Sequence, residues 1–309
     1  MAQKIVVEHG EWVAEDLRFK YARELELGNI LFFPQIPFDF PQEEIDFLLA
    51  QDQGASKRRK NIAYKPQLDK ITNHISPNKL VAEKMHQVLK NYSHRVTNFL
   101  SQLLSPYARH WQLDYASFRP FQEAGRRLRT RARNDLLHVD AFPTRPMHGA
   151  RILRFFTNIN PKEPRKWITA EHFRELAGMF GDHGVNFPET VGHAFADRMK
   201  SKMIELMRKA KIKITQRSPY DNFMLNLHHF MKENNEYQAN SIKDAWDFPP
   251  NSCWMVYTDL VSHAALSGQY ALEQTLIIPQ HTLLLPDQSP VSILERMTGR
   301  NLVLEMVKQ

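Results

Sequence analysis

The stretch Leu136-Leu137-His138-Val139-Asp140-Ala141-Phe142-Pro143 sets an imidazole and a carboxylate two residues apart among apolar neighbours. On an extended strand, side chains two residues apart point to the same face. A short apolar strand is also a poor place for a carboxylate that has no partner. The stretch therefore predicts a core strand that aims His138 and Asp140 at one point.

A second β-rich run ends in another imidazole. Residues 252–263 are rich in aromatic and β-branched side chains and finish at Ser262-His263-Ala264. Two imidazoles and one carboxylate on one face of an octahedron are the ligand set of non-haem Fe(II) oxygenases, because three positions stay open for a chelating co-substrate and O2. We therefore expect His138, Asp140 and His263 to bind one metal ion.

Composition predicts a globular protein with a sizeable core, since 42% of the 309 residues are apolar and 11% are aromatic. The single cysteine, Cys253, excludes an intrachain disulfide and a cysteine-based zinc site. The start Met1-Ala2-Gln3-Lys4 lacks the apolar centre of a signal peptide, and no apolar run approaches the roughly 20 residues that cross a bilayer. We expect a cytoplasmic protein.

The net charge of +7 favours anionic partners. Basic residues gather at 57–60, at 126–133 and from 198 to 213, and the second cluster runs almost directly into His138. Each cluster can be a solvated surface, but the second can also form a cationic mouth for a substrate beside the metal. Nucleic acid is not expected as a partner, because no aromatic side chains are interleaved with these clusters as stacking platforms.

Periodicity divides the chain into helical and extended regions. Apolar residues three and four apart predict a helix over 82–104, and alternation predicts strands over 113–120, 151–160 and 269–278. Further helices are expected over 169–179 and 189–211, from the cap Ser218 onward, and around 292–296.

These elements predict an α+β fold with a double-stranded β-helix (jelly-roll, cupin-like) core in one oxygenase domain, 1–309. In this interpretation residues 1–110 form a mostly helical N-terminal region, and residues 111–165 and 250–285 form the jelly-roll core. Residues 166–249 form a helical insertion between the metal-binding strands, and residues 286–309 a C-terminal tail.

Other histidines are weaker candidates for a metal site. His193 and Asp197 lie four apart on an expected helix but have no third ligand in range. The adjacent pair His228 and His229 diverges by about 100° on a helix, so the two cannot chelate one ion together. His148 lies in a turn-like context, as does His183. The zinc-protease, Walker and dinucleotide fingerprints are absent.

Four longer segments carry a resemblance beyond the three candidate ligands. The chain resembles the Kdo 3-hydroxylases of Gram-negative bacteria over nearly its whole length, in residues 28–34, 60–66, 134–146 and 262–275. The resemblance implies a dioxygenase that uses Fe(II), 2-oxoglutarate and O2 to hydroxylate C3 of 3-deoxy-D-manno-oct-2-ulosonic acid (Kdo) on Kdo-lipid A. The products would be Ko, succinate and CO2, with His138, Asp140 and His263 as metal ligands and catalytic residues. A carboxylate at 140 argues for hydroxylation, because a small residue there would leave room for a halide.

The anchor for the distal carboxylate of 2-oxoglutarate departs from the pattern of many such enzymes. The basic residue expected after the second histidine is absent, since positions 273–275 are Glu, Gln and Thr. We favour Arg154 because a guanidinium can bind both carboxylate oxygens; a salt bridge at the strand edge is its alternative role. Asn158 shares its face as a second candidate, Thr275 is a weaker one, and Arg151 on the opposite face is the main competitor.

The implied substrate brings further anions. Candidates for contacts with it are the arginines that flank the metal motif: Arg127, Arg129, Arg131, Arg133 and Arg145. Positive charge would attract the protein to the cytoplasmic face of the inner membrane as a peripheral protein. Two alternatives stay open: the same oxygenase chemistry on another anionic sugar or on a protein side chain, and a non-catalytic cupin-like module that binds anionic glycolipid or nucleic acid.

Overall fold

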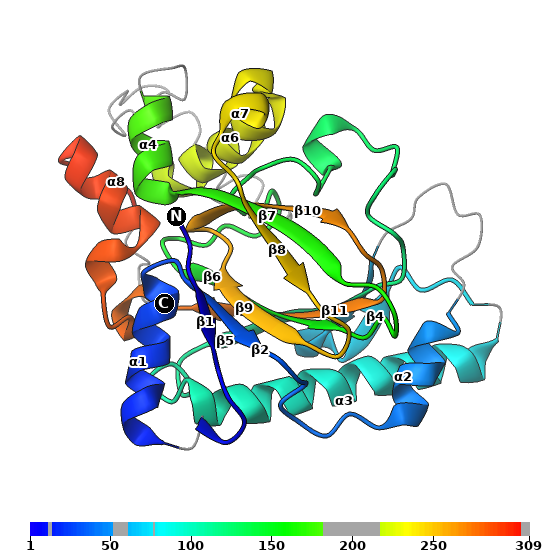
Figure 1. The fold of residues 1–309 in the computed structure, drawn as a ribbon. Coiled ribbons are helices and arrows are strands. Elements are labelled where there is room, and N and C mark those ends of the chain that lie inside the picture. Colours follow the sequence, from blue (N-terminus) through cyan, green and yellow to red (C-terminus); the bar gives the residue numbers. More distant parts are fainter. Residues whose placement is uncertain (12–13, 52–60, 77, 182–216, 304–309) are drawn as a thin grey trace, which may run out of the picture.

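The computed structural model describes residues 1–309 except 12–13, 52–60, 77, 182–216 and 304–309. Two sheets face one another, and helices cover their outer sides and one end (Figure 1). The mixed α+β class is as predicted. No helix in the described ranges is both long and apolar enough to cross a bilayer.

The larger sheet is antiparallel except for one parallel pair at its edge. In spatial order its strands are β1 (Lys4–Val6), β2 (Ile30–Phe33), β9 (Cys253–Tyr257), β6 (Arg151–Asn158), β11 (Ala271–Ile278), β5 (Gln112–Arg119), β3 (Ile62–Lys65) and β4 (Lys70–Thr72). The smaller sheet consists of β10 (Val261–Ser267), β7 (Arg165–His172) and β8 (Asp244–Phe248). The central strand β6 pairs with β9 on one side and β11 on the other.

One face of the larger sheet packs on the long helix α3 (Lys79–Leu103), which runs beneath it in Figure 1. The hydroxyl groups of Tyr92 and Thr157 lie 3.1 Å apart, and Ser93 donates a hydrogen bond to Gln274. Because side chains alternate along a strand, Arg154 and Phe156 of β6 point to the opposite face, toward the smaller sheet.

Aromatic rings fill much of the space between the two sheets. Trp254 stacks on Phe248 with ring centroids 4.0 Å apart and on Phe156 at 5.1 Å. Trp167 of β7 meets Phe156 edge-on at 4.8 Å. Offset and edge-on ring pairs of this kind add to the free energy gained from burial alone. Two of these rings, Phe156 and Trp167, also border the more polar cavity that contains the candidate metal ligands.

The other helices cap the ends and edges of the sheets. Their bounds are α1 (Glu15–Glu26), α2 (Gln42–Leu49), α4 (Phe173–Gly181), α6 (Pro219–Glu233), α7 (Asn235–Asn240) and α8 (Pro290–Thr298). Short 3₁₀ turns lie at Pro66–Leu68, Thr130–Ala132, Gln280–Thr282 and Pro286–Gln288. Helix α6 begins with a capping box, in which Ser218 and Asp221 satisfy each other's backbone N–H groups. The cap predicted at Ser218 is therefore confirmed.

Several predicted elements match and others need correction. The helix α3, the strands β5, β6 and β11, and the C-terminal helix α8 lie where periodicity placed them. The range 166–249 is not wholly helical, because it includes most of β7 and all of β8. The N-terminal region likewise contributes the strands β1 to β4 to the larger sheet. The predicted helix over 189–211 lies outside the described residues, as do His183, His193, Asp197 and the basic clusters at 57–60 and 198–213.

Two local predictions fail for identifiable reasons. The helix predicted over 169–179 starts later, at Phe173. Thr169 lies in β7, where its hydroxyl accepts a hydrogen bond from Trp246. The segment around His138 forms a single β-bridge with His263 and not a full strand. Pro143 follows soon after, and proline cannot donate to a strand ladder.

Candidate metal centre

The segment that carries His138 and Asp140 is held by backbone hydrogen bonds at both positions. The N–H of His138 donates to the carbonyl of His263 at 3.1 Å, and the N–H of His263 donates back at 2.9 Å. The N–H of Asp140 donates to the carbonyl of Thr258 at 2.8 Å. These bonds fix the two side chains against the turn between β9 and β10.

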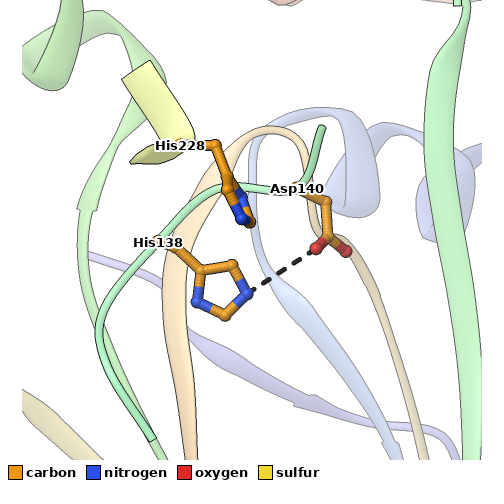
Figure 2. Close-up of side chains that lie close together, drawn as sticks. All are labelled: His138, Asp140 and His228. Carbon is orange, nitrogen blue, oxygen red and sulfur yellow. Dashed lines mark ion pairs between the residues drawn. The ribbon is translucent and has the colours of Figure 1, made fainter. Parts of the chain in front are cut away.

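Three potential ligands gather where this segment meets α6. One donor atom each from His138, Asp140 and His228 lies within 4.8 Å of the others (Figure 2). Nε2 of His138 is 3.7 Å from a carboxylate oxygen of Asp140. All three side chains are at most 9% exposed. A buried group of this composition matches the nitrogen and oxygen ligands that bind divalent iron.

His263 supplies a fourth potential ligand to the same place. Its ring centroid is 4.7 Å from that of His138, and its ring stacks on Trp167 at 5.3 Å. It lines the same cavity as the other three residues. His138, Asp140 and His263 therefore line one cavity, whereas the donor atoms that lie within 4.8 Å of one another belong to His138, Asp140 and His228.

Each imidazole is oriented by a hydrogen bond from Nδ1 to a backbone carbonyl. His138 donates to Leu136 at 2.7 Å, His228 donates to Val139 at 2.7 Å, and His263 donates to Val261 at 2.9 Å. In this tautomer Nε2 keeps its lone pair. Metal-binding histidines commonly use their second nitrogen in this way.

Burial also sets the protonation states that a metal requires. It lowers the pKa of His138 well below 6.5, lowers that of His263, and lowers that of His228 to about 4. Burial opposes ionisation of Asp140, but the positive charge of Arg154 is the largest of the causes that outweigh it and hold the pKa of that carboxyl far below its usual value. The site is thus prepared as neutral imidazoles and an ionised carboxylate, the forms that bind a metal.

These residues line a cavity of about 260 Å³ between the two sheets and α6. Its walls consist of Asn61, Arg119, Asn134, His138, Asp140, Phe142, Arg154, Phe156, Arg165, Trp167, His228, Lys232, His263 and Ala265. A space of this size accommodates a small dicarboxylate beside a metal ion. The cationic walls favour such an anion.

The arginines of the wall form a buried ionic network. Arg154 lies 3.0 Å from Asp140 and 3.1 Å from Glu273, and Arg119 also pairs with Glu273. The contact between Arg154 and Asp140 has the distance of an ion pair without the alignment of a hydrogen bond, because that carboxylate oxygen has no hydrogen-bond partner among the described residues. Arg165 reaches Glu123 at 3.4 Å and donates to the carbonyl of Gly268 at 3.0 Å.

Three buried N–H groups of this wall have no hydrogen-bond acceptor among the described residues. They are Nε of Arg154, Nε of Arg165 and Nε1 of Trp167. Buried donors without partners cost free energy, so they mark a place where a bound molecule can supply the acceptors. An anionic co-substrate fits this requirement.

The other co-substrate candidates already have partners. Arg151, fully buried, forms two hydrogen bonds with Asp259, at 2.8 and 3.2 Å, and lies over the ring of Tyr257. The amide of Asn158 donates to backbone carbonyls, among them that of Phe248 at 3.0 Å. The hydroxyl of Thr275 donates to Glu273 at 3.1 Å. None of Arg151, Asn158 and Thr275 is among the residues that line the 260 Å³ cavity.

The candidate substrate contacts lie outside this cavity. Arg127 and Arg129 are exposed. Of the remaining three, Arg131 pairs with Glu233, Arg133 with Asp135 and Arg145 with Asp114. Arg145 lines a second, smaller cavity that Asp140 also borders, and none of the five lines the 260 Å³ cavity.

Sequence reasoning missed most of the cavity wall, including four basic residues: Arg119, Arg165, His228 and Lys232. A signal for two of them was present, since His228 and Lys232 lie four apart and therefore on one face of a helix that begins at Ser218. His228 was weighed only as a joint metal ligand with His229, so the helix face that it shares with Lys232 was overlooked. The two arginines carried no comparable signal, because strand pairing alone brings them to the site.

Comparisons with known proteins agree with this geometry. A family model described as 3-deoxy-D-manno-oct-2-ulosonic acid (Kdo) hydroxylase matches residues 9–301. The crystal structure of a Kdo hydroxylase, a non-haem Fe(II) α-ketoglutarate-dependent dioxygenase, in complex with cobalt(II) is 34% identical, with 99% of each chain covered and a TM-score of 0.84. Structures of a Kdo hydroxylase with α-ketoglutarate and Fe(III), and with succinate and Fe(III), are 33% identical, with 99% of each chain covered and TM-scores of 0.83. No curated protein sequence matches the chain.

Proposed function

Since the chain belongs to the Kdo hydroxylase family, we propose that it is an Fe(II)- and 2-oxoglutarate-dependent dioxygenase that hydroxylates Kdo. The observation that carries the proposal is the convergence of buried, neutral imidazoles and an ionised carboxylate on one cavity with cationic walls. α-Ketoglutarate and succinate are the molecules bound in the two similar Fe(III) structures.

We assign the metal ligands as His138, Asp140 and His263. His138 and His263 are paired directly through their backbones, so both rings and the carboxylate of Asp140 are positioned by one bridged unit. His228 comes from α6 and would stand beside the ion. The facing sheets with ligands at their junction favour the double-stranded β-helix topology that the sequence predicted.

For the co-substrate we propose Arg154 as the anchor of the distal carboxylate, with the free Nε of Arg165 and Nε1 of Trp167 as further donors. Arg154 lines the cavity, whereas Arg151 is engaged by Asp259 outside it. A planar guanidinium binds a carboxylate through two parallel hydrogen bonds. Asn158 and Thr275 would then support the strands and not the co-substrate.

Bound Fe(II), together with 2-oxoglutarate and O2, would supply an oxidant strong enough for an unactivated C–H bond, which no side chain provides. The residues of the chain would orient the co-substrate, hold Asp140 ionised beside the metal and exclude bulk water. Phe142, Phe156 and Trp167 make the apolar part of the wall that does so. The position hydroxylated would be C3 of Kdo, with succinate and CO2 released.

The acceptor that we propose is Kdo-lipid A, converted to its Ko form, at the cytoplasmic face of the inner membrane. A net charge of +7 supports attraction to such an anionic surface. Co-sedimentation with anionic vesicles at low salt is the expected result, and absence of binding there would reject the peripheral membrane contact.

The experiment that tests the function is mass spectrometry of Kdo-lipid A after incubation with the protein, Fe(II), ascorbate and 2-oxoglutarate. A gain of one oxygen atom is expected, and it should be lost in His138→Ala and in Asp140→Ala. An unchanged mass with protein shown to bind iron would reject the assignment. Turnover with peptides or with other anionic sugars alone would favour the same chemistry on another substrate.

A further inference from the structure

Lys232 is a buried cation on the helix face that closes the cavity. It lies one turn after His228 on α6, is 3% exposed and lines the same 260 Å³ space as the metal cluster. After burial, its charge is the largest cause that lowers the pKa of His138. Its ammonium group therefore lies near the metal cluster.

Lys232 differs from the three cavity arginines in its partners. Arg119, Arg154 and Arg165 each have a carboxylate within 4.0 Å. Within the described ranges, Lys232 has none, and its hydrogen bond goes to the carbonyl of Arg131 at 3.3 Å. An ammonium group carries three donors, so two remain for a ligand. A buried cation without a carboxylate is costly unless something anionic binds there.

The charge balance of the site leads to the same conclusion. The cavity has four cationic side chains, and the carboxylates that contact its arginines are those of Asp140, Glu123 and Glu273. Fe(II) and the 2-oxoglutarate dianion cancel one another in charge. At least one positive charge remains, since Arg126 also pairs with Glu123, and Lys232 is the cavity cation without a carboxylate partner among the described residues. The loaded site is thus suited to one additional anionic group.

We propose that Lys232 binds the carboxylate of the sugar substrate and so places the C3 methylene, two bonds away, at the metal. The inference rests on the proposed function. The substrate's chemical name places its carboxylate at C1, its ketal carbon at C2 and its deoxy carbon at C3. A cation that holds the carboxylate therefore fixes the position of C3 within two bonds. His228, on the same face of α6, would adjoin the substrate on the metal side.

The test uses the full-length protein with two substrates: Kdo-lipid A, and the same compound with the Kdo carboxyl as its methyl ester. We expect the wild type to prefer the acid about 30-fold or more, the range for loss of one partner of a buried charge pair. Lys232→Met should raise KM for the acid by a similar factor and remove that preference. Lys232→Arg should restore part of it. KM for 2-oxoglutarate should change far less than KM for the acid, and the affinity for Co(II) should not fall, because the variant removes a positive charge near His138.

Lys166→Met is the matched control, because this lysine is exposed on β7 and should behave as wild type. If Lys232 only holds the turn at Arg131, Lys232→Met should lower thermal stability and leave the preference for acid over ester unchanged. Equal use of both substrates by the wild type would overturn the inference even if Lys232→Met failed to fold. An increased KM for 2-oxoglutarate alone would overturn it as well. No turnover of either substrate by wild type would reject the proposed function, and the inference with it.

Discussion

Replacing Arg154 by methionine is expected to weaken 2-oxoglutarate binding far more than it weakens the fold. In the free protein Arg154 contacts Asp140 at 3.0 Å and Glu273 at 3.1 Å, and its side chain is 13% exposed. Breaking a buried ion pair costs about 3–5 kcal/mol. Glu273 keeps Arg119 as a partner, so we expect the low end, about 3 kcal/mol, for the free energy of unfolding.

The effect on the co-substrate follows from the same side chain. A carboxylate that loses a buried bidentate partner is expected to lose about 3 kcal/mol of binding free energy, which raises Kd roughly 100-fold. Loss of Arg154 also removes the largest charge that holds the pKa of Asp140 down, so metal affinity should fall at acidic pH first. Calorimetric titration of 2-oxoglutarate into Co(II)-loaded protein measures the first effect, and titration of Co(II) into the metal-free protein at two pH values measures the second, both without turnover.

Arg151→Met is the matched control, because Arg151 lies on the same strand and pairs with Asp259 away from the cavity. It should lower stability and leave the Kd for 2-oxoglutarate unchanged. If the methionine variant unfolds, Arg151→Lys, which keeps the charge, replaces it as the control. An unchanged Kd in Arg154→Met, with a lower unfolding free energy, would show that Arg154 is a structural salt bridge and would refute its role as anchor.

Two further predictions concern the histidines. His263→Ala should abolish Co(II) binding, whereas His228→Ala should weaken it by no more than about 10- to 100-fold, as for groups beside the ligands; the reverse order in a metal titration would make His228 the third ligand. The metal-free protein should lose stability as the pH falls from 6.5 toward 4, because burial lowers the pKa of His228 to about 4 and the unfolded chain then binds more protons. The contribution of His228, about 3 kcal/mol, is complete above pH 6.5 and lost by about pH 4. Urea unfolding of the metal-free protein at pH 6.5 and at about pH 4 measures this contribution. A loss of unfolding free energy in His228→Gln equal to that of the wild type would contradict the role of His228.

Local patterns predicted those parts of the structure whose form depends on near neighbours. The stripe of α3, the cap at Ser218 and the alternation of β6 all depend on residues a few positions apart. That alternation was enough to place Arg151 and Arg154 on opposite faces, and the structure shows one with Asp259 and the other in the cavity.

Elements stabilised by distant partners could not be predicted in the same way. Strand β7 carries Thr169, whose preference for helix caps competes with a strand role until Trp246 of β8 binds its hydroxyl. Arg119 and Arg165 reach the cavity only because their strands lie in two facing sheets. His228 joins the metal cluster from α6, and its spacing from Lys232 indicated a shared helix face but not that this face reaches the metal cluster.

We propose that the cluster of His138, Asp140 and His263 directs one oxygen atom of O2 into Kdo while 2-oxoglutarate is oxidised to succinate and CO2. The most direct test is a single turnover under ¹⁸O2 with Fe(II), 2-oxoglutarate and Kdo-lipid A, followed by mass spectrometry of both products. We predict one ¹⁸O atom in the Kdo unit and one in succinate, in equal amounts, and neither with Asp140→Ala. Labelled succinate with unmodified Kdo would show that Kdo is not the substrate, and no succinate from iron-loaded protein would show that the chain does not oxidise 2-oxoglutarate.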